Sequence, residues 1–253
     1  MAQQPDSGLA GRTLPGPLYR AVTHVFDQQL TGCMLVGGTA LAGYYLGHRR
    51  SDDLDLFVRD ADAHRATVLA IQSLRELGAR IETSFRSSQF QKSICALDGH
   101  AFTADVVLDP TVHALGDGQV AGDGVRVAAL ETLMGQKAAT LVSRCAEKDL
   151  YDLLWLFRLH PDLELASLLE LGSRIDGGLT AESALISLVG TELMESACAF
   201  SITQSAEDVF REIMVLKSGL EQGLAELARN QPVPPLGELI KKLGRPRTPR
   251  TDS

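Results

Sequence analysis

Two short stretches decide the fold: VGGTAL at residues 36–41 and GHRRSDDLDLF at residues 47–57. The first follows a short apolar run, and its two glycines let the backbone turn sharply and approach a ligand closely. In the second stretch Asp53 and Asp55 alternate with apolar residues, as in a strand whose two faces differ. We therefore predict a strand, a sharp turn, a helix capped by Thr39, a loop, and a second strand that carries the two aspartates.

This pattern combines two carboxylates with a phosphate-binding turn. Side chains two residues apart on a strand point to the same face, so Asp53 and Asp55 lie together, with Cα atoms about 7 Å apart. Such carboxylates repel each other unless a cation lies between them, and their oxygens suit Mg²⁺ or Mn²⁺. Gly37, Gly38 and Thr39 at a helix start offer N–H groups and a hydroxyl to phosphate oxygens. The combination is typical of metal-assisted phosphoryl or nucleotidyl transfer, with both aspartates as catalytic metal ligands.

The stretch 37–57 resembles the signature of the nucleotidyltransferase superfamily, and more specifically that of the AbiEii/AbiGii-type toxin family. The family pattern is Gly-Gly-Thr-Ala-Leu, then Arg-x-Ser, then Asp-(Leu/Ile)-Asp-Leu. A second match lies downstream, where Lys137 is followed by Arg144 and by EKDLYDL at 147–153. Together the matches span residues 34–158, and the resemblance implies a nucleoside triphosphate (NTP) as substrate.

Lys137 lies on the apolar stripe of the helix expected over 129–146. Its head either reaches water past a packed stem or, as the resemblance implies, points at the triphosphate as a catalytic lysine. On the next helix Asp149 and Asp152 are neighbours, and Lys148 can pair with Asp152 at i,i+4. The resemblance makes Asp149 a candidate catalytic residue and Asp152 a candidate nucleotide-binding residue. Either residue would bind nucleotide or orient Lys137. The alternative is a solvated, ion-paired helix face.

The superfamily also implies a third metal-binding carboxylate on a neighbouring strand, and Asp105 is the best candidate. It interrupts the apolar run 101–108, where a charge needs a partner. The Asp-Gly pair at 98–99 predicts a two-residue hairpin that places Lys92 opposite Asp105, so an ion pair without metal is the alternative role. Asp109 competes for the metal, although Asp-Pro at a strand end is an ordinary turn.

The loop before the two aspartates supplies the remaining nucleotide-binding candidates, Arg50 and Ser51. The family pattern has an arginine before this serine, and Arg50 fits the spacing better than Arg49; one of the two is expected to reach phosphate. His48 is expected to be a loop histidine, because metal activation of the acceptor hydroxyl makes a separate base unnecessary.

The 253-residue chain divides near residue 128, where an α/β half gives way to a helical half. We predict an α+β fold: a nucleotidyltransferase-like mixed sheet with flanking helices plus a C-terminal helical domain, with the active site in the cleft between them. The expected parts are a flexible N-terminus (1–16), the α/β core (17–128), the helical domain (129–231) and a basic, Pro-rich tail (232–253) without regular elements. Helices after the core are expected over 129–146, 148–159, 163–173, 180–188, 191–200 and 205–229.

Composition excludes several classes of protein. A chain with 45% hydrophobic and 22% charged residues is typical of globular proteins. The sequence contains no run of 18 apolar residues, so no membrane-spanning helix is expected. Four scattered cysteines without metal-binding spacing, and no secretory segment, indicate reduced thiols in the cytoplasm. The net charge of −8 combines an acidic body with a basic tail over 241–253. The tail either tethers RNA or is a solvated, disordered end.

The resemblance implies that a nucleoside monophosphate moves from an NTP to an acceptor hydroxyl, with Mg²⁺ or Mn²⁺ as cofactor. It further implies an RNA acceptor such as the 3′ end of tRNA, and a toxin role with a cognate antitoxin protein. Two alternatives stay open. An acidic body suits a cationic small substrate, as in antibiotic-modifying nucleotidyltransferases. The second alternative is a non-catalytic relative that only binds nucleotide, and the intact set of Asp53, Asp55 and Lys137 argues against it.

Overall fold

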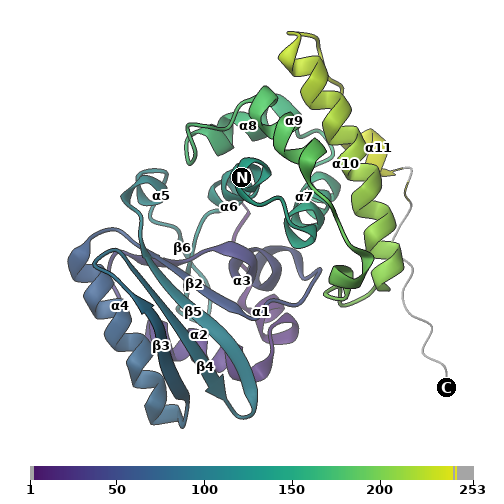
Figure 1. Cartoon of the computed structure of the whole chain (residues 1–253). Coiled ribbons are helices and arrows are strands. Elements are labelled where there is room, and N and C mark those ends of the chain that lie inside the picture. Colours follow the sequence, from purple (N-terminus) through teal and green to yellow (C-terminus); the bar gives the residue numbers. More distant parts are fainter. Residues whose placement is uncertain (1–2, 242, 244–253) are drawn as a thin grey trace, which may run out of the picture. The chain divides into compact units, whose positions relative to one another are not determined.

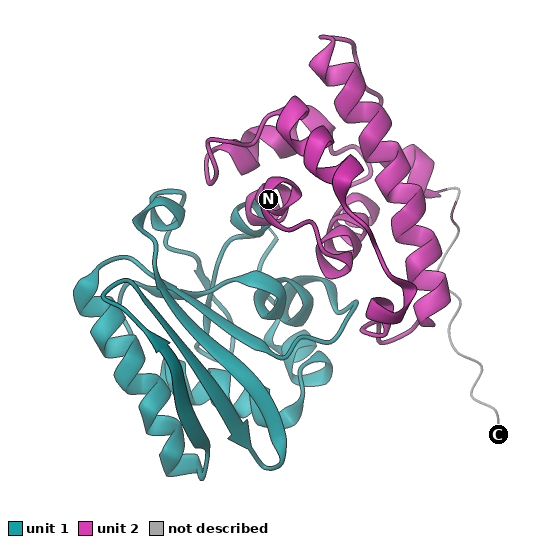
Figure 2. Ribbon diagram, viewed as in Figure 1, with its two compact units in different colours: residues 1–133 teal, residues 134–253 magenta. Residues whose placement is uncertain are grey.

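The computed structural model describes residues 3–241 and 243, which belong to two compact units, Met1–Leu133 and Met134–Ser253 (Figure 2). The division falls within one helix, α6 (Leu130–Ser143), so it lies a few residues beyond the expected change near residue 128. Among the described residues, no helix is long and apolar enough to cross a membrane.

Unit 1 is built on a seven-stranded mixed sheet with the strand order β3-β4-β5-β2-β1-β7-β6. Two pairs, β2–β5 and β1–β7, are parallel, and the other pairs are antiparallel. This mixed sheet confirms the predicted α+β class. The strands are β1 (Cys33–Leu35), β2 (Asp53–Val58), β3 (Arg80–Arg86), β4 (Phe90–Leu97), β5 (His100–Leu108), β6 (Gln119–Val120) and β7 (Arg126–Val127).

The central strand β2 has one apolar and one acidic face. Leu54, Leu56 and Val58 are fully buried, whereas Asp53 and Asp55 point to the other face. Helices α2 (Gly16–Asp27) and α4 (Ala61–Ser73) pack against the sheet and supply the other half of this core (Figure 1). Each fully buried aliphatic side chain contributes about 1.5–3 kcal/mol of transfer free energy. The core therefore holds the register of β2 and keeps its aspartates on the opposite face.

A tight hairpin connects β4 to β5, as the Asp-Gly pair predicts. Asp98 and Gly99 both have positive φ, 49° and 80°, as a two-residue hairpin turn of the favoured hand requires. The resulting register pairs Lys92 with Asp105, and this confirms the predicted alignment.

The N-terminal segment expected to be flexible contains a helix, α1 (Ser7–Thr13). Asp6 caps it by accepting a hydrogen bond from the backbone N–H of Leu9 at 3.1 Å. Ala10 and Leu14 are buried, and α1 contacts the π-helical segment η1 (Ala42–Leu46). Few apolar residues occur in this stretch, and they lie among Gly, Gln and Pro, so the hydrophobic periodicity is too weak to predict this helix.

The turn after β1 enters its helix earlier than predicted. Helix α3 (Gly37–Leu41) begins at the first glycine with Val36 as its N-cap, so Thr39 lies within the helix and does not cap it. The helix continues into η1, and the residue that follows η1, Gly47, has φ 63°. Gly37 has φ 66°, a left-handed conformation that glycine adopts without strain at this turn between β1 and α3.

Unit 2 is helical. The helices that match the predicted ones are α6, α7 (Glu147–Leu159), α8 (Leu165–Ser173), α9 (Ala181–Gly190) and α10 (Ala206–Ala228). The helix predicted over 191–200 is wrong, since only a 3-10 turn, η3 (Glu195–Cys198), forms there.

The prediction that no regular element follows Pro232 is also wrong, because α11 (Gly237–Lys241) lies in that stretch. Pro232, Pro234 and Pro235 precede the helix. Leu236 and Ile240, four residues apart, are both buried. The rest of the basic tail, residues 242 and 244–253, lies outside the described residues.

All four cysteines are buried and free, in agreement with the predicted reduced thiols. Burial raises the pKa of Cys33 to about 12 and that of Cys95 to about 11. These thiols are protonated at neutral pH and are poor nucleophiles.

Candidate active site

Three aspartates lie on one face of the sheet in unit 1, which we call the carboxylate face. The parallel register of β2 and β5 pairs Asp55 with Asp105 and Asp53 with Thr103. Side chains paired across neighbouring strands point to the same face. The hydroxyl of Thr103 donates to Asp53 Oδ1 at 2.8 Å and orients that carboxylate. The structure thus brings Asp105 to the same face as the two aspartates predicted to bind metal.

Asp105 has one engaged oxygen and one orphaned oxygen. Lys92 Nζ lies 3.2 Å from Oδ2, so the ion pair considered as an alternative role is present. The other oxygen, Oδ1, is buried without a hydrogen-bond partner among the described residues. Burial raises the pKa of Asp105 against the opposing effect of Lys92, and the charge of Asp53 raises it further. A divalent cation or a hydroxyl donor would satisfy this oxygen.

The donor set fits Mg²⁺ or Mn²⁺ without forming a complete protein cage. Within the described ranges, no three acidic, histidine or cysteine side chains are arranged as a metal cluster. Mg²⁺ is usually held by one or two carboxylates together with substrate phosphates and waters, so the pair Asp53 and Asp55 fits this ion and stays a prediction as its ligands. The role of Asp105 as a third metal ligand stays a prediction.

The two glycines at the start of α3 allow a close approach to charged side chains. A Cβ atom at Gly37 would overlap Asp55 Oδ2, and one at Gly38 would lie 2.5 Å from Arg49 Nη2. Any other residue at either position would displace the carboxylate or the guanidinium. The glycine turn therefore serves the geometry of the acidic strand as well as the backbone.

The structure brings Arg49, and not Arg50, to the glycine turn. Arg49 is buried, and its Nη1 donates to the backbone carbonyl of Arg50 at 2.9 Å. Arg50 is exposed. The prediction names Arg50, but the Arg-x-Ser pattern places its arginine two residues before Ser51, at Arg49. Neighbouring residues of an extended loop point in opposite directions, so only one arginine can face α3. The signal that could have identified Arg49 is its position two residues before Ser51, which is also buried.

Thr39 is fully buried and joins α3 to the start of β2. Its hydroxyl donates to the backbone carbonyl of Asp53, and its Oγ1 lies 3.0 Å from Ser51 Oγ. The hydroxyl of Thr39 is therefore engaged within the protein, and its phosphate contact stays a prediction. The contacts within the protein hold the loop that ends at the acidic strand.

Thr39→Val is expected to lower the free energy of unfolding by about 1–3 kcal/mol, because valine keeps the shape but leaves buried polar partners unsatisfied. Urea denaturation measures the change. Thr39→Ser is the matched control, since it keeps the hydroxyl and removes only a methyl group. An equal or larger loss in the serine variant would show that packing of the methyl group, and not the hydrogen bonds, stabilises this junction.

In unit 2, Lys137 is buried between two carboxylates. Its Nζ lies 2.9 Å from Asp149 Oδ1 and 2.7 Å from Asp152 Oδ2, and the lysine side chain is only 5% exposed. The alternative in which its head reaches water is therefore wrong. The predicted pairing of Lys148 with Asp152 is also wrong, since Lys148 is exposed and Asp152 is fully buried beside Lys137.

Asp149 receives donors at both of its oxygens. Arg144 Nε and Nη2 donate to it at 2.9 and 3.1 Å, in addition to Lys137. Burial by itself would raise the pKa of Asp149, but the charges of Lys137 and Arg144 outweigh it and the pKa is lowered. A carboxylate with this many donors is suited to hold Lys137 in one orientation.

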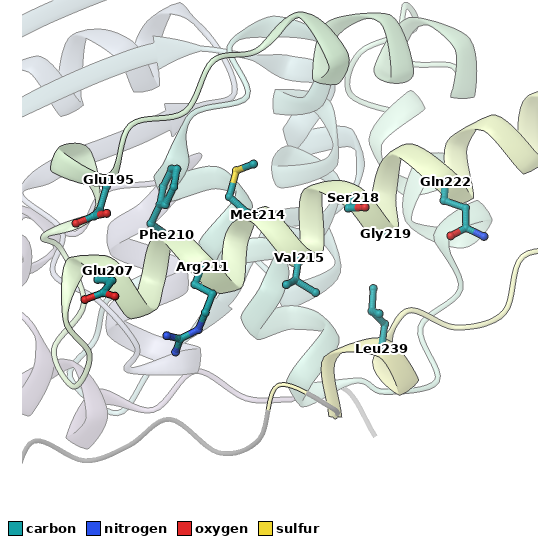
Figure 3. Close-up of a pocket in the computed structure, with 10 residues that line it drawn as sticks. All are labelled: Glu195, Glu207, Phe210, Arg211, Met214, Val215, Ser218, Gly219, Gln222 and Leu239. Atoms are coloured by element: carbon teal, nitrogen blue, oxygen red, sulfur yellow. The ribbon is translucent and has the colours of Figure 1, made fainter.

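A pocket of about 640 Å³ in unit 2 is lined mainly by one face of α10 together with Leu239 (Figure 3). Its lining is largely apolar and includes Phe210, Met214 and Val215. All of the predicted site residues lie in the described part of the chain, and none of them lines this pocket. The predicted site residues therefore lie outside this pocket, on the carboxylate face and around Lys137.

A mixed sheet with an Asp-x-Asp strand beside a Gly-Gly turn defines the class of nucleotidyltransferases. The family model described as nucleotidyl transferase AbiEii toxin, type IV TA system, matches residues 18–219. The chain therefore belongs to this family of nucleotidyltransferase toxins of type IV toxin–antitoxin systems, and it is an enzyme. The match confirms the family resemblance read from residues 34–158.

The solved structure of MenT4 agrees with the fold. MenT4, a nucleotidyltransferase toxin from Mycobacterium tuberculosis H37Rv, is similar over 94% of this chain and 98% of its own, with 15% identity and a TM-score of 0.54. JHP933 from Helicobacter pylori is 21% identical over 89% of this chain and 97% of its own, with a TM-score of 0.47. No curated protein matches the chain. At such identities the likeness to MenT4 supports the fold alone.

Proposed function

We propose that this toxin transfers a nucleoside monophosphate from an NTP to a hydroxyl of RNA, with the 3′ end of tRNA as the first candidate acceptor. One observation carries the proposal. The parallel register of β2 and β5 places Asp53, Asp55 and Asp105 on one face, with Asp55 against the glycine turn. This arrangement of carboxylates beside a close-approach turn is suited to a triphosphate with its metal ion.

In the proposed reaction, the acceptor hydroxyl releases its proton to solvent and its oxygen forms a bond to the α-phosphorus, the bond from that phosphorus to the bridging oxygen breaks, and pyrophosphate leaves. Asp53 and Asp55 would hold Mg²⁺ or Mn²⁺, which when bound stabilises negative charge on the phosphate and favours deprotonation of the hydroxyl. Arg49 and Ser51, at the glycine turn, would contact the phosphates. Asp105 Oδ1 can accept the hydrogen bond of the acceptor hydroxyl.

We further propose that Lys137 supplies positive charge to the triphosphate, and that Asp149 and Asp152 are positioning residues. Their support is geometric, since both carboxylates lie within 2.9 Å of Lys137 Nζ and are almost fully buried. A lysine held at two points loses little further conformational freedom when it meets its ligand. Membership of a toxin–antitoxin family also makes a cognate antitoxin protein the expected partner.

The net charge of −8 favours a second candidate acceptor, a cationic small molecule. The full-length protein is therefore incubated with each α-labelled NTP and Mg²⁺, together with either total RNA or an aminoglycoside. We expect the label to enter RNA, to fall to background when EDTA removes the metal, and to return when Mg²⁺ is added back. Label in the aminoglycoside alone would favour the second candidate. Absence of label from both acceptors with every NTP would contradict the proposal.

A further inference from the structure

The carboxylate face continues beyond the active-site candidates to the edge of the sheet. The register pairs Asp55 with Asp105, Asp105 with Lys92, and Lys92 with Phe85, across β2, β5, β4 and β3. Since residues in register on adjacent strands share a face, these four side chains form one row. The row runs from the predicted metal ligands to the edge strand β3, which is the last strand of the sheet on this side.

The outer end of this row carries large apolar side chains in contact with solvent. Phe85 is 54% exposed, and Ile94, on the same face of β4, is 48% exposed. The ring of Phe90 lies beside that of Phe85, with 5.7 Å between the centroids. We call Phe85, Phe90, Lys92 and Ile94 the edge platform. Adjacent exposed apolar side chains on a sheet face are a feature of binding surfaces.

The direction of the proposed reaction places the acceptor on the same side as the edge platform. The glycine turn follows β1, which borders β2 on one side, whereas β5 borders β2 on the other. An in-line displacement needs the attacking oxygen opposite the leaving pyrophosphate. With the triphosphate at the glycine turn, the acceptor hydroxyl therefore approaches over Asp105, which is the side of β4 and β3.

The spacing of the strands matches a short single strand of RNA. Neighbouring strands lie about 4.8 Å apart, so Lys92 and Phe85 stand about 10 and 14 Å from the row position of Asp55. The acceptor hydroxyl approaches over Asp105, which is one strand closer, so Lys92 and Phe85 lie about 5 and 10 Å from it. Stacked nucleotides advance about 3.4 Å each, so the platform would meet roughly the second to fourth nucleotides from the acceptor end.

We propose that the edge platform stacks the unpaired nucleotides immediately before the acceptor hydroxyl, an inference that rests on the proposed RNA acceptor. Aromatic side chains on an exposed sheet face stack RNA bases without regard to sequence. Lys92 Nζ lies 3.2 Å from Asp105 Oδ2, and because its side chain is 40% exposed, its remaining N–H donors can reach a phosphate between those bases. The continuity of the row with Asp105 and Asp55 favours the acceptor over a protein partner, which would not need to share a row with the reacting groups.

The test separates binding of the acceptor from binding of the NTP. With the full-length protein and total tRNA, Phe85→Ala is expected to raise KM for tRNA about tenfold, and KM for the NTP is expected to stay the same. The dissociation constant for a fluorescent single-stranded RNA hexanucleotide should rise by a similar factor. Phe85→Trp should restore both values. Leu69→Ala, which removes a 70% exposed apolar side chain from α4, is the matched control.

Each outcome decides for or against the platform. An unchanged KM for tRNA in Phe85→Ala would overturn it while leaving the proposed transfer intact. A wild-type protein that labels neither total RNA nor the aminoglycoside with any NTP, yet binds the hexanucleotide in a Phe85-dependent way, would remove the proposed function and support the edge platform as an RNA-binding surface. Unchanged RNA affinity together with lost binding of the cognate antitoxin would overturn the platform and assign this surface to a protein.

Discussion

Asp55→Asn is expected to reduce the rate of nucleotidyl transfer about a thousandfold or more. Asparagine keeps the shape of the side chain against Gly37 but removes the negative charge that would hold the divalent cation. A loss of about 4 kcal/mol of transition-state stabilisation corresponds to a factor of a thousand, and a metal ion typically supplies several kcal/mol. Initial rates of label transfer from the α-labelled NTP measure the effect, with thermal unfolding as a check on the fold.

Asp52→Asn is the matched control for this substitution. Asp52 precedes β2, is exposed, and its Oδ1 lies 3.2 Å from His100 Nε2. Asp52 carries the same charge as Asp55 but lies one residue before β2. Removing its charge should therefore leave the transfer rate within about twofold of the wild type, as for a surface substitution. A rate for Asp55→Asn within tenfold of the wild type would contradict the role of Asp55 as a metal ligand.

The sequence predicts the register of the candidate site well, because local rules determine it. Alternation of apolar residues and aspartates specifies which face of β2 is acidic, since a shift of one residue would bury both charges. The Asp-Gly turn at 98–99 specifies the pairing of β4 with β5, and so the position of Asp105 opposite Lys92. Neither signal places β5 beside β2, so the position of Asp105 next to Asp55 is expected from the family resemblance, and it depends on the parallel pairing of β2 with β5.

Contacts between distant residues are what the sequence does not predict. The choice between Arg49 and Arg50 depends on which one meets Gly38, and this requires the positions of two loops. Helical spacing pairs Lys148 with Asp152, but the buried Lys137 from another helix takes that carboxylate, since an unpaired buried charge is costly. The exposure of Phe85 is likewise invisible in a strand-like run of residues, where an aromatic side chain is usually taken as core.

Lys137→Met is expected to lower the free energy of unfolding by about 3–5 kcal/mol, because it leaves two buried carboxylates without their shared cation. The side chains of Asp149 and Asp152 are 1% and 0% exposed, so water cannot replace the lysine. Methionine has nearly the length of the lysine stem, so the loss does not arise from a cavity. Urea denaturation at neutral pH measures the change.

Adding Asp152→Asn to Lys137→Met is the matched control, because it removes one uncompensated charge and should recover part of the lost stability. The effect also depends on pH. The pKa of Asp149 is lowered in the folded wild type, so its contribution is present above the ordinary carboxyl pKa and is lost as the pH falls through the lowered value. Acid also neutralises the carboxylates that have lost Lys137 in the variant, so the gap between the two proteins should narrow below about pH 4. A gap that stays constant from neutral to acidic pH would show that lost packing, and not unpaired charge, destabilises the variant.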